Sequence, residues 1–171
     1  RRPSLEAQIA NLADEIAYNN HDVDDGLRSG LIDPQQLCEV KIFERHRSAV
    51  LLLYPKLTGR RLVHETVRHM IDTLVTDHIE SSAKNIKRAA LKSLDDVRAA
   101  PALIGFSEAI RKEQLELKRF LNEKLYRHYR VARMSRKARS VVTDLFGAFI
   151  AEPRLLPPEF QVRAGDDKAR A

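Results

Sequence analysis

The chain has 171 residues, of which 43% are hydrophobic and 32% are charged, with only six glycines and seven prolines. This composition excludes a disordered, collagen-like or low-complexity chain and predicts a packed, largely helical protein of about the size of one domain. A single cysteine excludes an internal disulfide, a zinc ribbon and a CxxC pair, and the net charge of +6 favours anionic partners such as nucleotides or nucleic acid.

The sequence carries no signal for membrane insertion or secretion. Its longest apolar run, residues 49–54, is far shorter than the roughly 20 residues of a spanning helix, and the basic start has no signal-peptide core. We therefore expect a cytoplasmic protein that does not enter the membrane. Because the first residue is Arg1 rather than Met, we also expect a fragment or a processed product.

Apolar residues at helical spacing predict helices throughout the first half of the chain. Ser4 can cap a helix that runs to about Asn19, with an apolar face formed by Leu5, Ile9, Leu12 and Ile16. The glycines of residues 24–33 predict a turn-rich connection. One or two helices are expected up to Pro55, and the clearest stripe predicts a long helix from residue 58 towards residue 91.

The second half is also predicted to be helical. Residues 95–106 contain Pro101 and Gly105 and are expected to form the longest internal loop. Ser107 then starts a helix, and a last helix begins near Ser135 and stops before Pro153. The sequence lacks the alternating pattern of strands, so the predicted fold class is all-α.

One polar stripe on the first helix is a candidate site. Asp14, Tyr18 and Asp22 are four residues apart and lie on one line while the helix continues, away from the apolar Ile16. Two carboxylates and a phenol can ligate a hard metal and hold a hydroxylated ligand. The spacing alone leaves this reading open beside that of a solvated helix face.

A basic cluster at the start of the long helix is a second candidate site. Lys56, Arg60 and Arg61 precede or begin the helix, where free backbone N–H groups already favour a phosphate. His64 lies one turn further on. Lys56, Arg60 and Arg61 are expected to contact a triphosphate, with His64 facing the same region, and the alternative is a basic surface turn.

Residues 111–139 are strongly basic, with eleven Lys and Arg against three Glu, and Tyr126 and Tyr129 lie among the charges. This pattern is compatible with single-stranded nucleic-acid binding through phosphate contacts and stacking. An oligomer interface or a second nucleotide site would have the same pattern. The candidate contact residues are Arg119, Lys124, Arg127 and Arg130.

Residues 4–31 read SLEAQIANLADEIAYNNHDVDDGLRSGL. This run closely resembles bacterial deoxyguanosinetriphosphate triphosphohydrolase-like proteins of the HD superfamily, as do residues 60–64, 70–77 and 120–128. The resemblance implies the carboxy-terminal part of a larger, all-helical enzyme. That enzyme would hydrolyse a deoxynucleoside triphosphate (dNTP) to deoxynucleoside and tripolyphosphate with a divalent metal such as Mg²⁺ or Mn²⁺.

The resemblance also implies roles for the polar stripe. Asp14 matches the family's final metal-binding aspartate and would be catalytic. Related HD-domain dNTPases have a D-x3-Y-x3-D pattern, by which Tyr18 packs on the deoxyribose and Asp22 accepts a hydrogen bond from its 3′-hydroxyl. The family's histidine and His-Asp ligands lie upstream, and His21-Asp22 is not that pair. The chain alone is therefore expected to bind metal poorly and to be inactive.

These interpretations predict three segments and a set of partners. Residues 1–33 are expected to form the helix and loop with the last part of the HD active site, residues 34–160 the carboxy-terminal helical region, and residues 161–171 a frayed tail. The expected partners are a dNTP substrate and further copies in a homo-oligomer. The alternative function is a basic helical module for nucleic-acid binding or oligomerisation.

Overall fold

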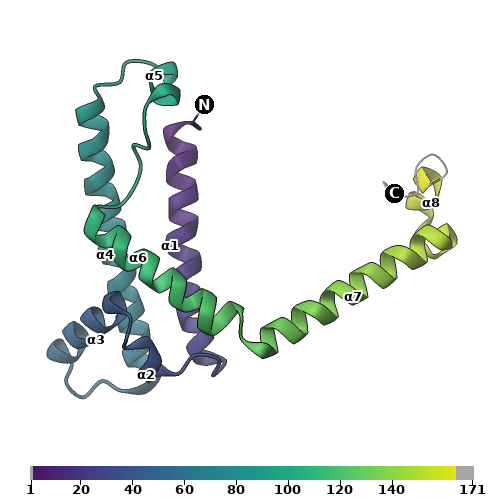
Figure 1. Cartoon of the computed structure of the whole chain (residues 1–171), viewed down its shortest axis with the longest axis horizontal. Coiled ribbons are helices and arrows are strands. Elements are labelled where there is room, and N and C mark those ends of the chain that lie inside the picture. The colour runs from purple at the N-terminus through teal and green to yellow at the C-terminus, as the bar shows by residue number, and fades with distance from the viewer. Residues whose placement is uncertain (1, 165–171) are drawn as a thin grey trace. The chain divides into compact units, whose positions relative to one another are not determined.

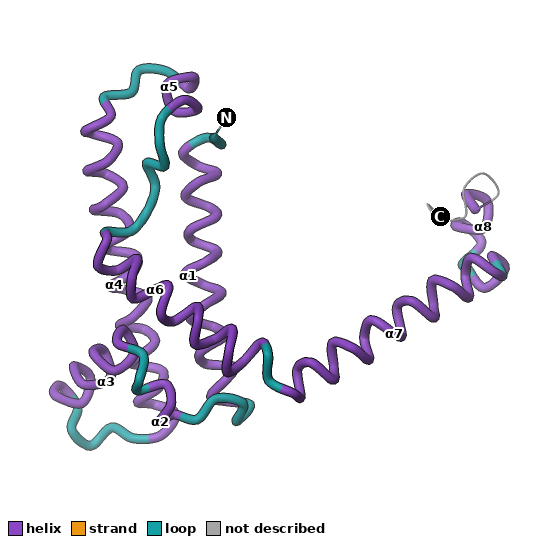
Figure 2. The backbone as a smooth tube through the Cα atoms, viewed as in Figure 1, coloured by secondary structure: helices purple, strands orange, loops and turns teal. Residues whose placement is uncertain are grey.

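A computed structural model of the chain describes residues 2–164 (Figure 1). Within this range the regular elements are all helices, and no strand occurs (Figure 2). The predicted all-α class is therefore confirmed. The chain divides into two compact units, Arg1–Tyr126 and Arg127–Ala171, and each unit is described by itself.

Helix α1 (Leu5–Arg28) is longer than the sequence predicts. Ser4 caps it, with its Oγ accepting a hydrogen bond from the backbone N–H of Ala7. The expected end near Asn19 and the connection from residue 24 are wrong, because Gly26 lies inside the helix. A Cβ at Gly26 would collide with the side chain of Ile32, so this glycine permits close packing rather than a turn.

Three helices follow in the first unit: α2 (Pro34–Leu37), α3 (Lys41–Leu53) and α4 (Gly59–Ala89). They confirm the helices predicted up to Pro55 and the long helix after it. Every fourth residue along the middle of α4 is buried, as expected for one face of a helix. These residues are Thr66, Met70, Leu74, His78 and Ser82.

The segment expected to be the longest loop contains a short helix, α5 (Leu94–Ala99). A capping box starts it, because Ser93 accepts from the backbone of Asp96 while the Asp96 side chain accepts from the backbone of Ser93. Ser107 caps α6 (Glu108–Leu121), as predicted. The π-helical segment η1 (Asn122–Tyr126) then continues α6 to the end of the first unit.

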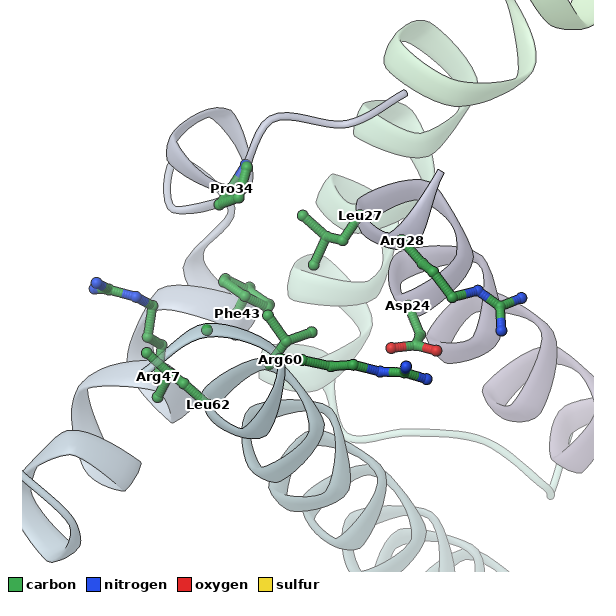
Figure 3. A pocket seen from close by; sticks show the side chains of 10 residues that line it. Asp24, Leu27, Arg28, Pro34, Phe43, Arg47, Arg60 and Leu62 are labelled. Carbon is green, nitrogen blue, oxygen red and sulfur yellow. The ribbon is translucent and has the colours of Figure 1, made fainter. Parts of the chain in front are cut away.

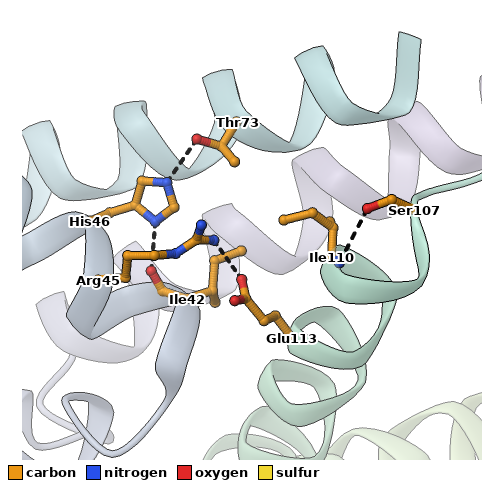
Figure 4. Close-up of polar contacts among 7 residues, drawn as sticks. All are labelled: Ile42, Arg45, His46, Thr73, Ser107, Ile110 and Glu113. Carbon is orange, nitrogen blue, oxygen red and sulfur yellow. Dashed lines mark hydrogen bonds and ion pairs between the residues drawn. The ribbon is translucent and has the colours of Figure 1, made fainter. Parts of the chain in front are cut away.

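The core of the first unit forms where α1, α3, α4 and α6 meet (Figure 1). Its fully buried side chains come from all four helices, and burying each CH₂ group contributes about 0.8 kcal/mol. Polar contacts fix the helices around this core (Figure 4). Arg45 on α3 pairs with Glu113 on α6 at 2.6 Å, and Lys118 on α6 pairs with Glu15 on α1 at 2.7 Å.

The second unit contains α7 (Tyr129–Ala151), the 3-10 turn η2 (Pro153–Leu155) and α8 (Pro158–Ala164). Helix α7 begins earlier than the predicted start near Ser135, because the side chain of His128 caps the backbone N–H of Arg130 at 3.3 Å. Of the tail expected over residues 161–171, residues 161–164 complete α8 and 165–171 lie outside the described residues. None of the described helices is long and apolar enough to span a membrane.

Candidate functional site

The predicted polar stripe lies along one uninterrupted helix. Asp14 and Tyr18 are exposed on α1, and Asp22 is half-buried one turn further on. The neighbouring face of α1 is buried by Ile16 and Val23. Because that face anchors the helix in the core, the three side chains of the stripe are held in line at fixed spacing.

Tyr126, at the end of η1, joins this stripe. Its hydroxyl donates a hydrogen bond to Oδ2 of Asp22. Its ring lies beside that of Tyr18, with centroids 6.5 Å apart and an interplanar angle of 43°. The structure therefore brings together two predicted site residues, Tyr18 and Asp22, and one residue from a distant part of the sequence.

The electrostatics of this cluster define which groups donate and which accept. Burial raises the pKa of the Tyr126 phenol above its usual range, and the hydrogen bond to Asp22 and the charge of that carboxylate raise it further. Tyr126 therefore remains a protonated donor at neutral pH. Oδ1 of Asp22 has no hydrogen-bond partner within residues 2–164, so it can accept a hydrogen bond from a hydroxyl group of a ligand.

Asp14 is the residue of the stripe that the sequence predicts to be a metal ligand. Asp14 offers an exposed hard oxygen ligand of the kind that Mg²⁺ and Mn²⁺ prefer. However, no three His, Cys, Asp or Glu side chains of the described residues gather closely enough to hold an ion. The described residues alone therefore do not form a complete metal site.

The predicted basic cluster is exposed, and one member, Arg60, also lines a cavity. Lys56, Arg60, Arg61 and His64 are all solvent-accessible around the start of α4. Arg60 lines a cavity of about 460 Å³ between α1, α2, α3 and α4 (Figure 3). Lys56 lines a separate surface hollow formed by Leu53–Leu57.

The cavity beside Arg60 has an apolar wall and a charged rim. Phe43 and Leu27 belong to the wall, and Arg60 extends along the rim beside Asp24 (Figure 3). Asp24 follows Asp22 by two residues, which places it roughly 200° around α1 from the end of the polar stripe. The cavity and the stripe therefore use different faces of α1.

Arg60 is the one arginine of this rim without an ion-pair partner in the described part of the chain. Arg28 pairs with Asp25 at 2.7 Å, and Arg47 lies 3.4 Å from Glu44. Acidic neighbours therefore offset much of the positive charge of the cavity.

The basic region over residues 111–139 is divided between the two units. Arg119 and Lys124 belong to the first unit, where Lys124 pairs with Glu123 at 3.1 Å. Arg127 and Arg130 belong to the second, where Arg130 donates to the hydroxyl of Tyr129 at 3.2 Å. The charges that form one run in the sequence are thus carried by two separately packed bodies.

Comparison with known proteins identifies relatives over the whole chain. A deoxyguanosinetriphosphate triphosphohydrolase-like protein of Bordetella pertussis is 58% identical over 170 residues, and one of Thiobacillus denitrificans is 56% identical over 171 residues. A protein of the same name from Nitrosomonas europaea is 61% identical over 158 residues. The chain is homologous to these triphosphohydrolase-like proteins. The family model of a phosphohydrolase-associated domain matches residues 104–171.

The alignments cover nearly all of this chain but less than half of each triphosphohydrolase-like protein. They include 99% of the chain and 44% of the Bordetella protein, 100% and 46% for Thiobacillus, and 92% and 42% for Nitrosomonas. The matched region thus includes both units and the polar stripe of α1. The resemblance expected from residues 4–31 is confirmed.

The sequence pattern around Tyr126 predicts a role different from its contacts in the structure. Its position among basic residues indicated stacking on nucleic acid, whereas its hydroxyl contacts Asp22, which is 104 residues away in the sequence. The one signal for it was its place in the 120–128 stretch that resembles the triphosphohydrolase-like proteins. No local pattern could reveal a contact made through tertiary packing.

Proposed function

We propose that this chain is part of a metal-dependent enzyme that hydrolyses dNTPs to deoxynucleoside and tripolyphosphate. The observation that carries the proposal is the alignment of Asp14, Tyr18 and Asp22 on one helix, in a chain homologous to triphosphohydrolase-like proteins. The free Oδ1 of Asp22 and the exposed ring of Tyr18 supply an acceptor and an aromatic wall for a sugar.

Each residue of the stripe has a role in this proposal. Asp14 is one ligand of a divalent metal, Mg²⁺ or Mn²⁺, which would stabilise negative charge at the reacting phosphate. Tyr18 packs against the deoxyribose and crowds a 2′-hydroxyl. Asp22 accepts a hydrogen bond from the 3′-hydroxyl. The remaining ligands of the metal come from a part of the complete protein outside this chain, so the chain alone is inactive.

In the same proposal the basic cluster contributes phosphate contacts, although the cavity that Arg60 lines is on a different face of α1 from the stripe. Arg60 is the strongest candidate, because its guanidinium is exposed and has no ion-pair partner among the described residues. Lys56 and Arg61 are further phosphate candidates near the start of α4, and His64 is a candidate for contact with the edge of the base. The positive side chains of Lys56, Arg60 and Arg61 would bind the charged phosphates of the substrate.

The products formed by the complete protein test this function. Incubation with dGTP and the other dNTPs, with Mg²⁺ or Mn²⁺, should release tripolyphosphate and deoxynucleoside in equal amounts, as measured by ion-exchange chromatography. The 171-residue chain alone should release neither. Release of pyrophosphate or orthophosphate as the first product, or no hydrolysis of any dNTP, would contradict the proposal.

The exposed apolar side chains of α7 in the second unit support an additional proposed role in homo-oligomerisation. No residue of α7 is buried, although the helix carries a stripe of large apolar side chains. Their exposed fractions are 67% for Val142, 64% for Met134, 55% for Phe146 and 51% for Leu145. An apolar face of this kind is typical of a surface that another helix covers.

Sedimentation of the complete protein tests the oligomer. The wild type should form a defined oligomer, and Phe146→Asp should shift it towards monomer. Ser140→Asp adds the same charge on the opposite side of α7 and should leave the oligomer intact. A wild type that is monomeric but binds single-stranded DNA with a steep salt dependence would replace this role with the nucleic-acid alternative.

A further inference from the structure

Buried packing of α6 and η1 places Tyr126 beside the polar stripe of α1. Leu117 and Leu121 on α6 and Leu125 in η1 are all buried, and they occur at intervals of four residues. These side chains anchor α6 and η1 in the core of the first unit. Helix α6 crosses α1 in Figure 1, and the Lys118 to Glu15 ion pair joins the two helices. Tyr126 follows directly on the last anchored leucine.

The π-helical turn is the local feature that accompanies this placement. The five residues Asn122–Tyr126 form wider turns than an α-helix, so Tyr126 leaves the axis of α6 at a different angle from that of an unbroken helix. A single wide turn of this type is rare and occurs frequently at functional sites. Here it ends at the residue that contacts both Tyr18 and Asp22.

The hydrogen bond from Tyr126 determines how Asp22 can be used. An aspartate carboxylate has two oxygens and can rotate about its side-chain bonds. With Oδ2 accepting from the phenol of Tyr126, the carboxylate is held in one orientation and Oδ1 remains available. Carboxylate oxygens are strong hydrogen-bond acceptors, so the available Oδ1 can bind a hydroxyl group of a ligand.

We propose that Tyr126 is a positioning residue for the deoxyribose: it orients Asp22 towards the 3′-hydroxyl of the sugar and supports the ring of Tyr18. This inference rests on the proposed function, and it adds a specific residue from η1 to the half-site on α1. It also assigns a role to the phosphohydrolase-associated region, which begins at residue 104 and includes Tyr126.

A comparison of two substrates tests this role in the complete protein. Tyr126→Phe keeps the ring and removes the hydroxyl, so kcat/KM for a dNTP should fall about tenfold, as expected for the loss of one hydrogen bond to a charged group. The same change should alter kcat/KM for a 2′,3′-dideoxynucleoside triphosphate by no more than about twofold, because that substrate has no 3′-hydroxyl for Asp22 to bind. A merely structural role would reduce the hydrolysis of both substrates equally.

Two further variants complete the experiment. Tyr54→Phe removes an exposed hydroxyl that has no hydrogen-bond partner in the described chain, and it should leave kcat/KM for both substrates unchanged. Asp22→Asn should lower kcat/KM for the dNTP as well, and adding Tyr126→Phe to it should cause little further loss because the two residues act as a unit. Circular dichroism checks that each variant is folded.

The outcomes separate this inference from the proposed function. If the wild type hydrolyses dNTPs and Tyr126→Phe matches it, or loses activity equally on both substrates, the positioning role is overturned while the proposed function stands. Fully additive losses in the double variant would also overturn it. A wild type that hydrolyses no dNTP overturns the proposed function and this inference with it.

Discussion

The two units of the chain use apolar residues in opposite ways. In the first unit, four helices share one core, and side chains such as Met70, Leu74 and Leu117 are completely buried. In the second, the 23 residues of α7 include no buried side chain, although Leu145 and Phe146 are as apolar as the core residues. A helix gains little stability from its own hydrogen bonds, so packing against a partner normally stabilises it.

This difference separates the part of the chain that organises a site from the part that offers a surface. The stripe of α1 and Tyr126 belong to the unit with a core, and a packed core can hold the proposed site in a fixed geometry. The exposed stripe of α7 belongs to the unit for which we propose association with another copy of the chain. The proposed enzyme therefore needs the first unit for chemistry and the second for assembly.

Alanine substitutions in the two units give the largest expected difference. Leu117→Ala should lower the free energy of unfolding by about 2–5 kcal/mol, because it opens a cavity in the core of the first unit. Leu145→Ala, at a side chain that is 51% exposed in the single chain, should change it by no more than about 0.5 kcal/mol when the chain is dilute enough to be monomeric. Urea unfolding of the 171-residue chain, followed by circular dichroism, measures both. Equal losses would contradict the contrast between the units.

A smaller effect should appear as the pH falls, and it comes from His46 in the first unit. Its ring is buried on α3, with Nδ1 donating to the carbonyl of Ile42 at 2.7 Å and Nε2 accepting from Thr73 at 2.8 Å (Figure 4). Burial lowers the pKa of His46, and the charge of Arg45 lowers it further, against the opposing effects of the Ile42 carbonyl and Glu113.

The sign of the pH effect follows from this lowered pKa. The unfolded chain binds a proton near pH 6.5, whereas folded His46 resists protonation, so stability should fall as the pH decreases below about 6.5. In His46→Gln the side chain at position 46 cannot titrate, so the free energy of unfolding should fall less steeply with decreasing pH than in the wild type. Unfolding of both proteins at pH 7.5 and 5.5 measures the difference. Parallel losses in the two proteins would mean that His46 does not contribute.

The sequence predicted those parts of the molecule that depend on local patterns. The apolar stripe of α4, the Ser107 cap and the alignment of Asp14 with Asp22 all follow from helical spacing. Helix α5 is absent from the sequence prediction because Pro101 and Gly105 indicate a loop over residues 95–106. Its short length also offers few apolar positions from which a period can be read.

The remaining features depend on contacts between distant residues. The role of Gly26 follows from the close approach of Ile32 after the chain has turned, and the role of Tyr126 from the crossing of α6 over α1. The exposure of the apolar stripe on α7 is a further example, because a periodic apolar face indicates that it needs cover without identifying the partner.

The most direct test of the central claim is a matched pair of aspartate variants in the complete protein. Asp14 and Asp72 are both exposed, lie within long helices, and have no ion pair or hydrogen bond through their carboxylates in the described chain. Tripolyphosphate release from dGTP, measured with Mg²⁺ or Mn²⁺, should be abolished by Asp14→Asn and unchanged by Asp72→Asn. Wild-type activity in Asp14→Asn, or an equal loss in both variants, would contradict the assignment of α1 to the active site.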